Sequence, residues 1–308
     1  MPVLTMTVGL PGCGKTTWAN EAVQTAKSKT VVVNMDDIRE TMSGSHKNYK
    51  FNSDNESYVQ TVQCHAAVEA VQKKWNIIVA DTNLNPKTRN KWVAFAKEHG
   101  YTVQYKDFFE EFKKDKTFSH EYFAIRKYVK KCKEQNIQRS KVVPDEVIDR
   151  MAEDYFYSTI QHPTCDDSEL PEAIIVDMDG TVAHMWNRSP YDTGPKLLDD
   201  KPDEEVILSV IAEHEYMDRH VIFMSGRKEA GRQYSEQWIQ HYSIPYEVLH
   251  MRADDDNRSD DIVKYELYMK HVFGKYKVCK VFDDRNQVVD MWRTLCGLKV
   301  LQVAPGNF

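Results

Sequence analysis

The segment GLPGCGKT at residues 9–16 constrains the fold of this chain more than any other part of the sequence. It matches the phosphate-binding pattern G-x-x-x-x-G-K-[ST], with a β-rich run before it and a helical run after it. In that setting the backbone N–H groups of the loop and the positive end of the following helix dipole face a phosphate. The alternative is a chance match in a turn that contains glycine. Because the strand and helix context is present, the sequence predicts a nucleoside triphosphate site in an α/β fold.

The residues of this loop have different expected tasks. Lys15 is expected to reach the β- and γ-phosphates, and the Thr16 hydroxyl is expected to bind Mg²⁺. The glycines allow the backbone to approach the phosphate oxygens. The loop residues predicted to bind the nucleotide are Gly9, Gly12, Gly14, Lys15, Thr16 and Thr17.

The order of strand-like and helix-like segments indicates two domains. Apolar strand candidates alternate with helical candidates in the first half, a pattern typical of a parallel sheet with helices on both faces. The segment QHPTCDDSELPE is polar, contains prolines and is the best linker candidate, and the apolar run AIIVDM follows it. We expect a first domain over residues 1–143, a connecting helix and linker over 144–169, and a second domain over 170–308. Each domain is expected to contain a doubly wound parallel sheet.

Composition limits the compartment and the partners. The six cysteines form no C-x-x-C pair, and neither a secretory signal nor a membrane-length apolar run is evident, so we expect a cytoplasmic protein with reduced thiols. The chain has a formal net charge of −6. Residues 1–141, however, hold 23 Lys and Arg against 15 Asp and Glu. A polyanion such as nucleic acid is one explanation of the basic first half, and a solvated lysine-rich surface is the other.

Carboxylates follow two of the predicted strands in the first half. Asp36 and Asp37 come directly after the second strand candidate, where ligands bind in α/β sheets. One of them is suited to accept a proton from a substrate hydroxyl, and the other to act as a helix N-cap. Asp81 ends NIIVAD and is expected to support Mg²⁺ or an arginine, unless it is a plain turn residue. Phosphoryl transfer also needs positive charge on the migrating group, and Arg126 or Arg139 is a candidate for a lid arginine if it is not merely a surface residue.

The segment IIVDMDGT in the second half places Asp177 and Asp179 on one side of an extended chain. Asp177 is predicted to attack phosphorus and form an aspartyl-phosphate, and Asp179 to protonate the leaving oxygen. Spaced aspartates also occur in calcium loops. The like charge of Asp177 is expected to raise the pKa of Asp179, against the opposing effect of Mg²⁺ and Lys264.

Three further motifs follow in the same order as in haloacid-dehalogenase-type phosphatases, which this half resembles. SGR provides Ser225 as a donor to phosphate, and DDIVK provides Lys264 to hold the anion. VFDD provides Asp283 and Asp284, which are hard oxygen ligands suited to Mg²⁺.

The chain as a whole resembles the bifunctional polynucleotide 5′-kinase/3′-phosphatases of T-even bacteriophages. The matching segments are PGCGKTTWA, DDIR, DTNLNP, KVVP, DMDGT, RSPYD, SGR, DDIVK, DDRNQVVDMW and QVAPGNF. They cover both halves in the same order. DTNLNP and DDRNQVVDMW serve no general phosphate chemistry, and they point to this family specifically.

The resemblance implies a P-loop kinase domain, a haloacid-dehalogenase-like phosphatase domain, ATP as phosphate donor and Mg²⁺. In the first domain it implies that Asp36 is the general base toward a 5′-hydroxyl, that Arg39 holds the adjacent phosphate with support from Asp81, and that Arg139 is the lid arginine. That last match is imperfect, because the family arginine aligns with Gln138 here. Arg126 therefore stays an alternative.

In the second domain the resemblance carries over a set of catalytic, substrate-binding and metal-binding residues. Asp177, Asp179, Arg188, Arg227 and Lys264 are expected to be catalytic. Ser225 and Asp260 are expected to bind the substrate, and Asp177, Asp179, Asp283 and Asp284 the metal.

The function expected from these motifs is the healing of RNA or DNA ends, in partnership with a nucleic acid ligase and as a homotetramer. The alternative is a bifunctional kinase/phosphatase that acts on a small sugar or nucleoside. A nucleotide-binding scaffold without activity is a third reading. It is opposed by the presence of Lys15, Asp36, Asp177 and Asp179 together.

Overall fold

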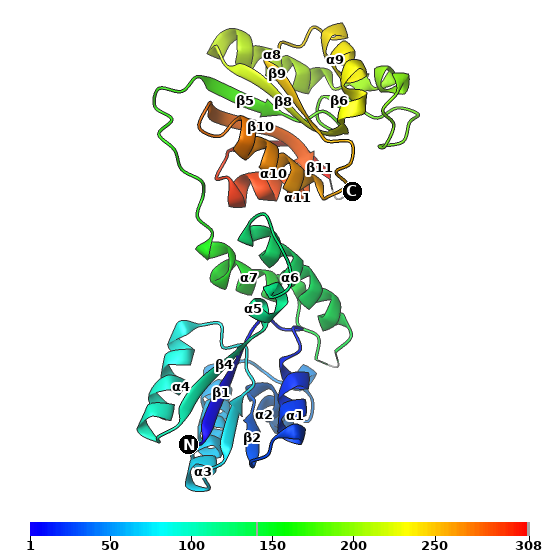
Figure 1. The fold of residues 1–308 in the computed structure, drawn as a ribbon. Helices are drawn as coiled ribbons and strands as arrows, with labels where there is room; N and C mark the ends of the chain where they lie inside the picture. The colour runs from blue at the N-terminus through cyan, green and yellow to red at the C-terminus, as the bar shows by residue number, and fades with distance from the viewer. Residues whose placement is uncertain (140, 307–308) are drawn as a thin grey trace. The chain divides into compact units, whose positions relative to one another are not determined.

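The computed structural model describes residues 1–139 and 141–306, and the chain divides into two compact units, Met1–Thr159 and Ile160–Phe308. The first unit contains a four-stranded sheet in the order β2-β3-β1-β4, and all paired strands are parallel (Figure 1). The strands are β1 (Val3–Val8), β2 (Thr30–Val33), β3 (Asn76–Val79) and β4 (Thr102–Asp107). The helices are α1 (Lys15–Thr25), α2 (Met35–Ser43), α3 (Ser53–Gln72), α4 (Pro86–Glu98), α5 (Phe108–Lys113), α6 (Glu121–Ile137) and α7 (Asp145–Tyr155), with short 3₁₀ turns at His46–Asn48 and Tyr157–Thr159.

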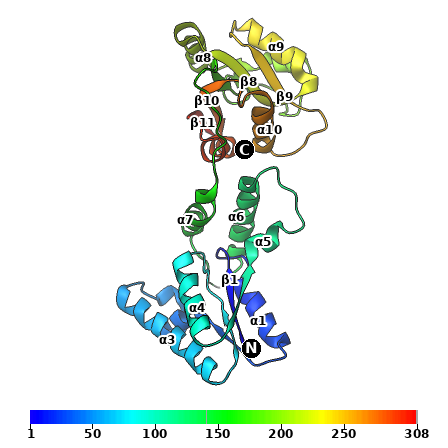
Figure 2. The same cartoon turned by 60° about the vertical axis from the view of Figure 1, so that its left-hand side comes forward.

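Helices cover both faces of this first sheet, because successive side chains of a strand point to opposite faces. Ile77 and Val79 of β3 pack with Ala67 of α3 and Trp92 of α4. Ile78, between them, packs with α1. Figure 2 shows α3 and α4 on one side of β1 and α1 on the other. The doubly wound arrangement therefore follows from the continuous apolar run in β3.

The segment after β4 forms a helical layer that is packed on the phosphate loop. Helix α6 places Tyr128, Cys132 and Asn136 on one face, one helical turn apart, and all three are buried. Helix α7, which the sequence assigns to the connection between the domains, packs against α6 and belongs to the first unit.

The second unit contains a five-stranded parallel sheet in the order β11-β10-β5-β8-β9. Its strands are β5 (Glu172–Val176), β8 (His220–Lys228), β9 (Val248–Arg252), β10 (Lys277–Arg285) and β11 (Val300–Gly306). Its helices are α8 (Glu204–Met217), α9 (Arg232–His241), α10 (Asp260–His271) and α11 (Asn286–Asp290), the last continued by a π-helical turn at Met291–Leu295. A two-stranded pair, β6 (Ala183–His184) with β7 (Lys201–Pro202), and 3₁₀ turns at Pro195–Asp199 and Glu229–Gly231 complete the unit.

The central strands β5 and β8 are apolar on both faces, as parallel strands buried between helices are. Ile174 and Phe223 belong to a core that Ile207 of α8 and Trp238 of α9 close. In Figures 1 and 2, α8 and α9 lie on one side of this sheet and α10 on the other. The fold class expected from the sequence, two doubly wound α/β domains, is thus confirmed. No helix among the described residues has the length and apolarity that a membrane span needs.

Candidate functional sites at the strand ends

The phosphate loop lies between β1 and α1, as its pattern predicts. Gly14 precedes α1 with φ 100°, and the exposed Thr16 and Thr17 follow Lys15 in the first helical turn. Lys15 is 9% exposed, and its ammonium donates to the carbonyl oxygens of Gly9 at 2.9 Å and Leu10 at 2.7 Å. The ammonium is therefore held inside the curve of the loop, where a bound triphosphate would meet it.

Helix α6 supports the loop from behind. A Cβ on Gly12, which has φ +84°, would lie 2.1 Å from the Cys132 carbonyl oxygen and 3.1 Å from the Asn136 Cβ. The backbone N–H of Leu10 donates to the Tyr128 hydroxyl at 3.3 Å. Burial raises the pKa of the Cys132 thiol to about 12, so this cysteine stays neutral. Only glycine fits at position 12. The residues that require it lie more than 115 positions away in the sequence, so a local sequence pattern cannot reveal this packing.

Asp36 and Arg39 meet on one face of α2. The Arg39 guanidinium donates to Asp36 Oδ1 at 2.7 Å and forms a two-pronged contact with Glu56 of α3, at 3.0 and 2.7 Å. Burial lowers the pKa of Arg39, but the hydrogen bonds and charges of Glu56 and Asp36 outweigh it, so the pKa is raised and the cation is permanent. Three of the five guanidinium N–H donors are used, which leaves two for a phosphate. The Asp36 side chain is 41% exposed, so a substrate hydroxyl can approach it.

The expectation that Asp36 or Asp37 caps a helix is wrong, and the expected support of Arg39 by Asp81 is limited to charge attraction without a described direct contact. Neither Asp36 nor Asp37 caps α2. The Asn34 side chain does so by accepting from the Asp36 N–H at 2.7 Å. Asp81 does not contact Arg39 in any described hydrogen bond. Its two oxygens accept from the Met35 N–H at 2.9 Å and from Gln63 at 2.5 Å, and burial raises its pKa. Asp81 therefore fixes the start of α2, and Glu56 is the residue that holds Arg39.

The two candidates for the lid arginine differ in their position on and after α6. Arg139 donates to Asn136 Oδ1 at 3.5 Å, and Asn136 contacts the phosphate loop at Gly12. Arg126 lies two residues before Tyr128, whose side chain faces the loop. Two residues of an α-helix correspond to a rotation of about 200°, so Arg126 points away from the loop. The Asn136 contact supports Arg139 over Arg126 as the lid arginine, and that role stays a prediction.

The second unit gathers four charged residues near the carboxyl ends of β5 and β10: Asp177, Lys264, Asp283 and Asp284. Lys264 of α10 is fully buried, and its ammonium lies 2.9 Å from both Asp177 Oδ1 and Asp283 Oδ2. Burial lowers the pKa of Lys264, but Asp177, Asp283 and Asp260 outweigh it and raise the pKa, which keeps the ammonium charged. Burial also raises the pKa of Asp177 well above its ordinary range, against the attraction of Lys264. Lys264 therefore compensates the repulsion between the carboxylates.

Oxygen atoms of Asp177, Asp283 and Asp284 lie within 4.8 Å of one another, and all three residues are buried. Three hard carboxylate oxygens at this spacing fit a Mg²⁺ ion that keeps several waters. Asp179 was also expected to bind the metal, and its carboxylate is not part of this group.

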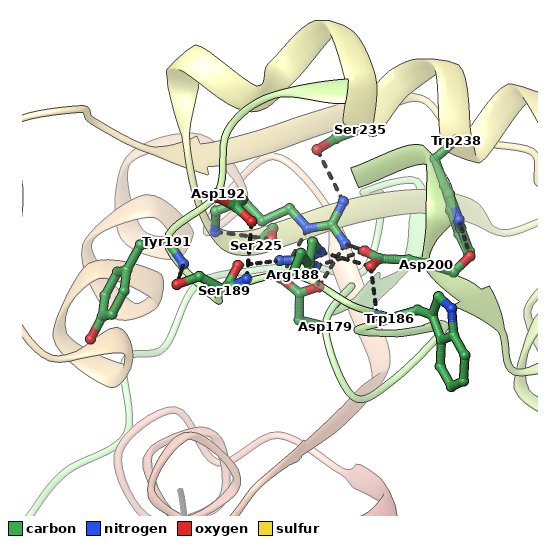
Figure 3. A network of polar contacts seen from close by, with 11 residues as sticks. Asp179, Trp186, Arg188, Ser189, Tyr191, Asp192, Asp200, Ser225, Ser235 and Trp238 are labelled. Carbon is green, nitrogen blue, oxygen red and sulfur yellow. Dashed lines mark hydrogen bonds and ion pairs between the residues drawn. The ribbon is translucent and has the colours of Figure 1, made fainter. Parts of the chain in front are cut away.

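Asp179 is instead enclosed by arginines, as Figure 3 shows. Arg227 donates to its two oxygens at 2.9 and 2.6 Å, and Arg188 donates to Oδ1 at 2.6 Å. Both guanidiniums also bind Asp200, a fully buried carboxylate just before β7, at 2.6–2.7 Å. Burial raises the pKa of Asp179, but Arg227 and Arg188 outweigh it and hold the pKa below its ordinary value. The expectation of a raised pKa is therefore wrong, because two guanidiniums bind Asp179 directly.

The remaining predicted residues line the same edge of the sheet. Ser225 is buried in the second half of β8, and its hydroxyl accepts from the Arg227 N–H at 3.2 Å. Asp260 starts α10 and pairs with Arg252 at 3.0 Å and Lys264 at 3.7 Å. It is a buried support for Lys264 in this structure, so its expected contact with substrate stays a prediction.

Several residues of these sites are not predictable from the sequence: Asn34, Glu56, Tyr128, Asp200 and Arg252. None of them belongs to a motif with a spacing of its own. Asp200 lies three residues before Asp203, the N-cap of α8, and its position in the sequence does not link it to Arg188 or Arg227.

Two family models match the chain, one for each half. Residues 4–156 match an AAA domain, and residues 171–308 match the phosphatase domain of the polynucleotide kinase PNKP. A protein of Autographa californica nuclear polyhedrosis virus, named as a bifunctional polynucleotide kinase/RNA ligase, is 29% identical over 312 residues. The match covers 95% of this chain and 41% of that protein, so the chain spans about two fifths of its relative.

Two solved structures of a Pnkp1/Rnl/Hen1 RNA repair complex contain a chain that is 28% identical to this one. The matches cover 100% of this chain and 97% or 98% of the other, with a TM-score of 0.46 in each case.

Proposed function

We propose that this chain belongs to the polynucleotide kinase/phosphatase family and that it heals nucleic-acid ends with two independent sites. The first site transfers the γ-phosphate of ATP to a 5′-hydroxyl, and the second removes a 3′-phosphate. The observation that carries the proposal is the buried cluster of Asp177, Lys264 and Asp283 beside the arginine-bound Asp179, in the same chain as a phosphate loop.

In the kinase reaction, the loop and Lys15 hold the triphosphate while Asp36 accepts the proton of the 5′-hydroxyl. The hydroxyl oxygen forms a bond to the γ-phosphorus as the bond to the β-γ bridging oxygen breaks. Arg39, anchored by Glu56, presents its free N–H groups to the phosphate next to the acceptor end. Arg139 supplies positive charge to the migrating group from the end of α6.

In the phosphatase reaction, an Asp177 oxygen attacks the phosphorus of the 3′-phosphate and the 3′-oxygen leaves with a proton. Mg²⁺ held by Asp177, Asp283 and Asp284 would neutralise phosphate charge when bound. A phosphate dianion competes with Asp179 for Arg188 and Arg227, and this competition frees Asp179 to carry the proton. Asp179 then accepts a proton from the water that hydrolyses the aspartyl-phosphate.

The finer statements stay part of the proposal. We take the acceptor to be RNA or DNA rather than a small sugar or nucleoside, because the second half matches a polynucleotide-specific family. The baculovirus relative joins a kinase name to an RNA ligase name in one protein, which supports a ligase as functional partner. The closer likeness to T-even phage enzymes and the homotetramer are inferences from the sequence resemblance, and the cytoplasmic location is an inference from composition.

The test uses one 5′-hydroxyl oligonucleotide and one 3′-phosphorylated oligonucleotide. Wild-type protein should transfer labelled γ-phosphate from ATP to the first and release inorganic phosphate from the second, both with Mg²⁺. Lys15→Ala should abolish only the transfer, and Asp177→Asn only the release. Equal turnover on a free nucleoside, or loss of both activities in either folded variant, would contradict the proposal.

A further inference from the structure

We propose that Trp186 is a stacking platform for the 3′-terminal nucleobase of the phosphatase substrate. This inference rests on the proposed phosphatase function and adds a specificity-determining residue to it. Trp186 lies in the segment between β6 and the 3₁₀ turn Pro195–Asp199, two residues before Arg188. In Figure 3, Trp186 and Tyr191 lie on opposite sides of the cluster of Arg188 and Asp179.

The Trp186 side chain is available to a ligand. It is 53% exposed, although tryptophan is a residue that folding normally covers. It does not belong to the hydrophobic core of this unit, which Trp238 helps to fill. The indole therefore contributes little to the packing of the fold, and its exposure needs another explanation.

The position of Trp186 is nevertheless fixed relative to the reacting groups. Its backbone N–H donates to Asp200 Oδ1 at 3.3 Å, and the same oxygen accepts from Arg188 Nε at 2.7 Å. Arg188 in turn reaches Asp179 at 2.6 Å. A short chain of polar contacts thus links the backbone of Trp186 to the carboxylate that is proposed to protonate the 3′-oxygen.

The surroundings of the ring suit an anionic aromatic ligand. The Lys201 ammonium lies 3.5 Å from the centre of the Trp186 ring. This contact is a cation–π interaction that orients the ring and places positive charge over one of its faces, so a nucleobase would stack on the other face. Every nucleobase offers a flat face to an exposed indole, so stacking binds a terminal nucleotide without selecting its sequence. A non-sequence-specific end-healing enzyme requires that type of contact.

The test compares two 3′-phosphorylated oligonucleotides that differ only in whether the terminal nucleotide carries a base. With the base present, Trp186→Ala should raise KM about 5- to 100-fold, the effect of losing one base–aromatic stack, with little change in kcat. On the abasic substrate the same variant should match the wild type within about twofold. Trp186→Phe should restore most of the binding, since phenylalanine retains a face for stacking.

Tyr216→Ala is the matched control, since Tyr216 is 82% exposed near the end of α8 and precedes the amino end of β8. It should leave both substrates unaffected. An equal loss on both substrates, or no loss on either, would overturn the role of Trp186 while the phosphatase function stands. Absence of phosphate release by the wild type on both substrates would instead overturn the proposed function itself.

Discussion

Replacing Asp200 with Asn is expected to destabilise the second unit strongly. The Asp200 side chain is fully buried, and it accepts from Arg188 at 2.7 and 2.6 Å and from Arg227 at 2.7 Å. With Asp179, the two carboxylates balance the two guanidiniums. The Asn variant leaves one buried positive charge uncompensated, which costs about 3–5 kcal/mol in the free energy of unfolding. With a urea m-value of about 2 kcal/mol/M, the midpoint should fall by about 2 M.

The matched variant is Asp179→Asn, which removes a carboxylate from the same two arginines. The Asp179 side chain is 26% exposed, so water already screens part of its attraction for the two buried arginines, and we expect a loss of about 1–2 kcal/mol. Urea unfolding of the second unit, followed by tryptophan fluorescence, measures both variants, and retained kinase activity shows that the first unit is intact. A loss in Asp200→Asn that does not exceed that of Asp179→Asn would refute the reasoning from burial.

Three further predictions concern other parts of the chain. Gly180→Ala should abolish phosphatase activity, because the added Cβ would lie 2.1 Å from Asp284 Oδ2. The control Gly44→Ala, at φ +74° with open space around it, should lower the free energy of unfolding in urea by only about 1–2 kcal/mol and retain activity. Glu56→Gln weakens the two-pronged anchor of the acceptor-side arginine and should raise KM for the 5′-hydroxyl oligonucleotide about 10-fold without changing KM for ATP in steady-state assays. Burial lowers the pKa of His250 to about 4. The unfolded chain therefore takes up a proton at this histidine before the folded protein does, and the free energy of unfolding declines as the pH falls from about 6.5 toward 4. His250→Gln should reduce this decline by at most about 3 kcal/mol, measured by urea unfolding at pH 7 and pH 4.5.

The sequence by itself determined the features that depend on contiguous residues. Phosphate binding uses successive backbone N–H groups and one nearby lysine, so GLPGCGKT identifies the loop without any tertiary information. The same holds for Asp177, which directly follows a buried apolar strand. The fold class was predictable too, because continuous apolar strands alternating with helical segments are compatible with few other architectures.

The tertiary structure alone decided which charges meet. Arg227 and Asp179 are 48 residues apart in the sequence, and Arg188 and Asp200 are 12 apart, yet the four form one cluster. Arg39 likewise finds its anchor in Glu56 of another helix.

These pairings set the protonation of Asp179 in the direction opposite to the one that its neighbour Asp177 suggests. The reason is physical. A pKa depends on the distance to every nearby charge and on the exclusion of water, and both are properties of three-dimensional packing that spacing along the chain does not encode.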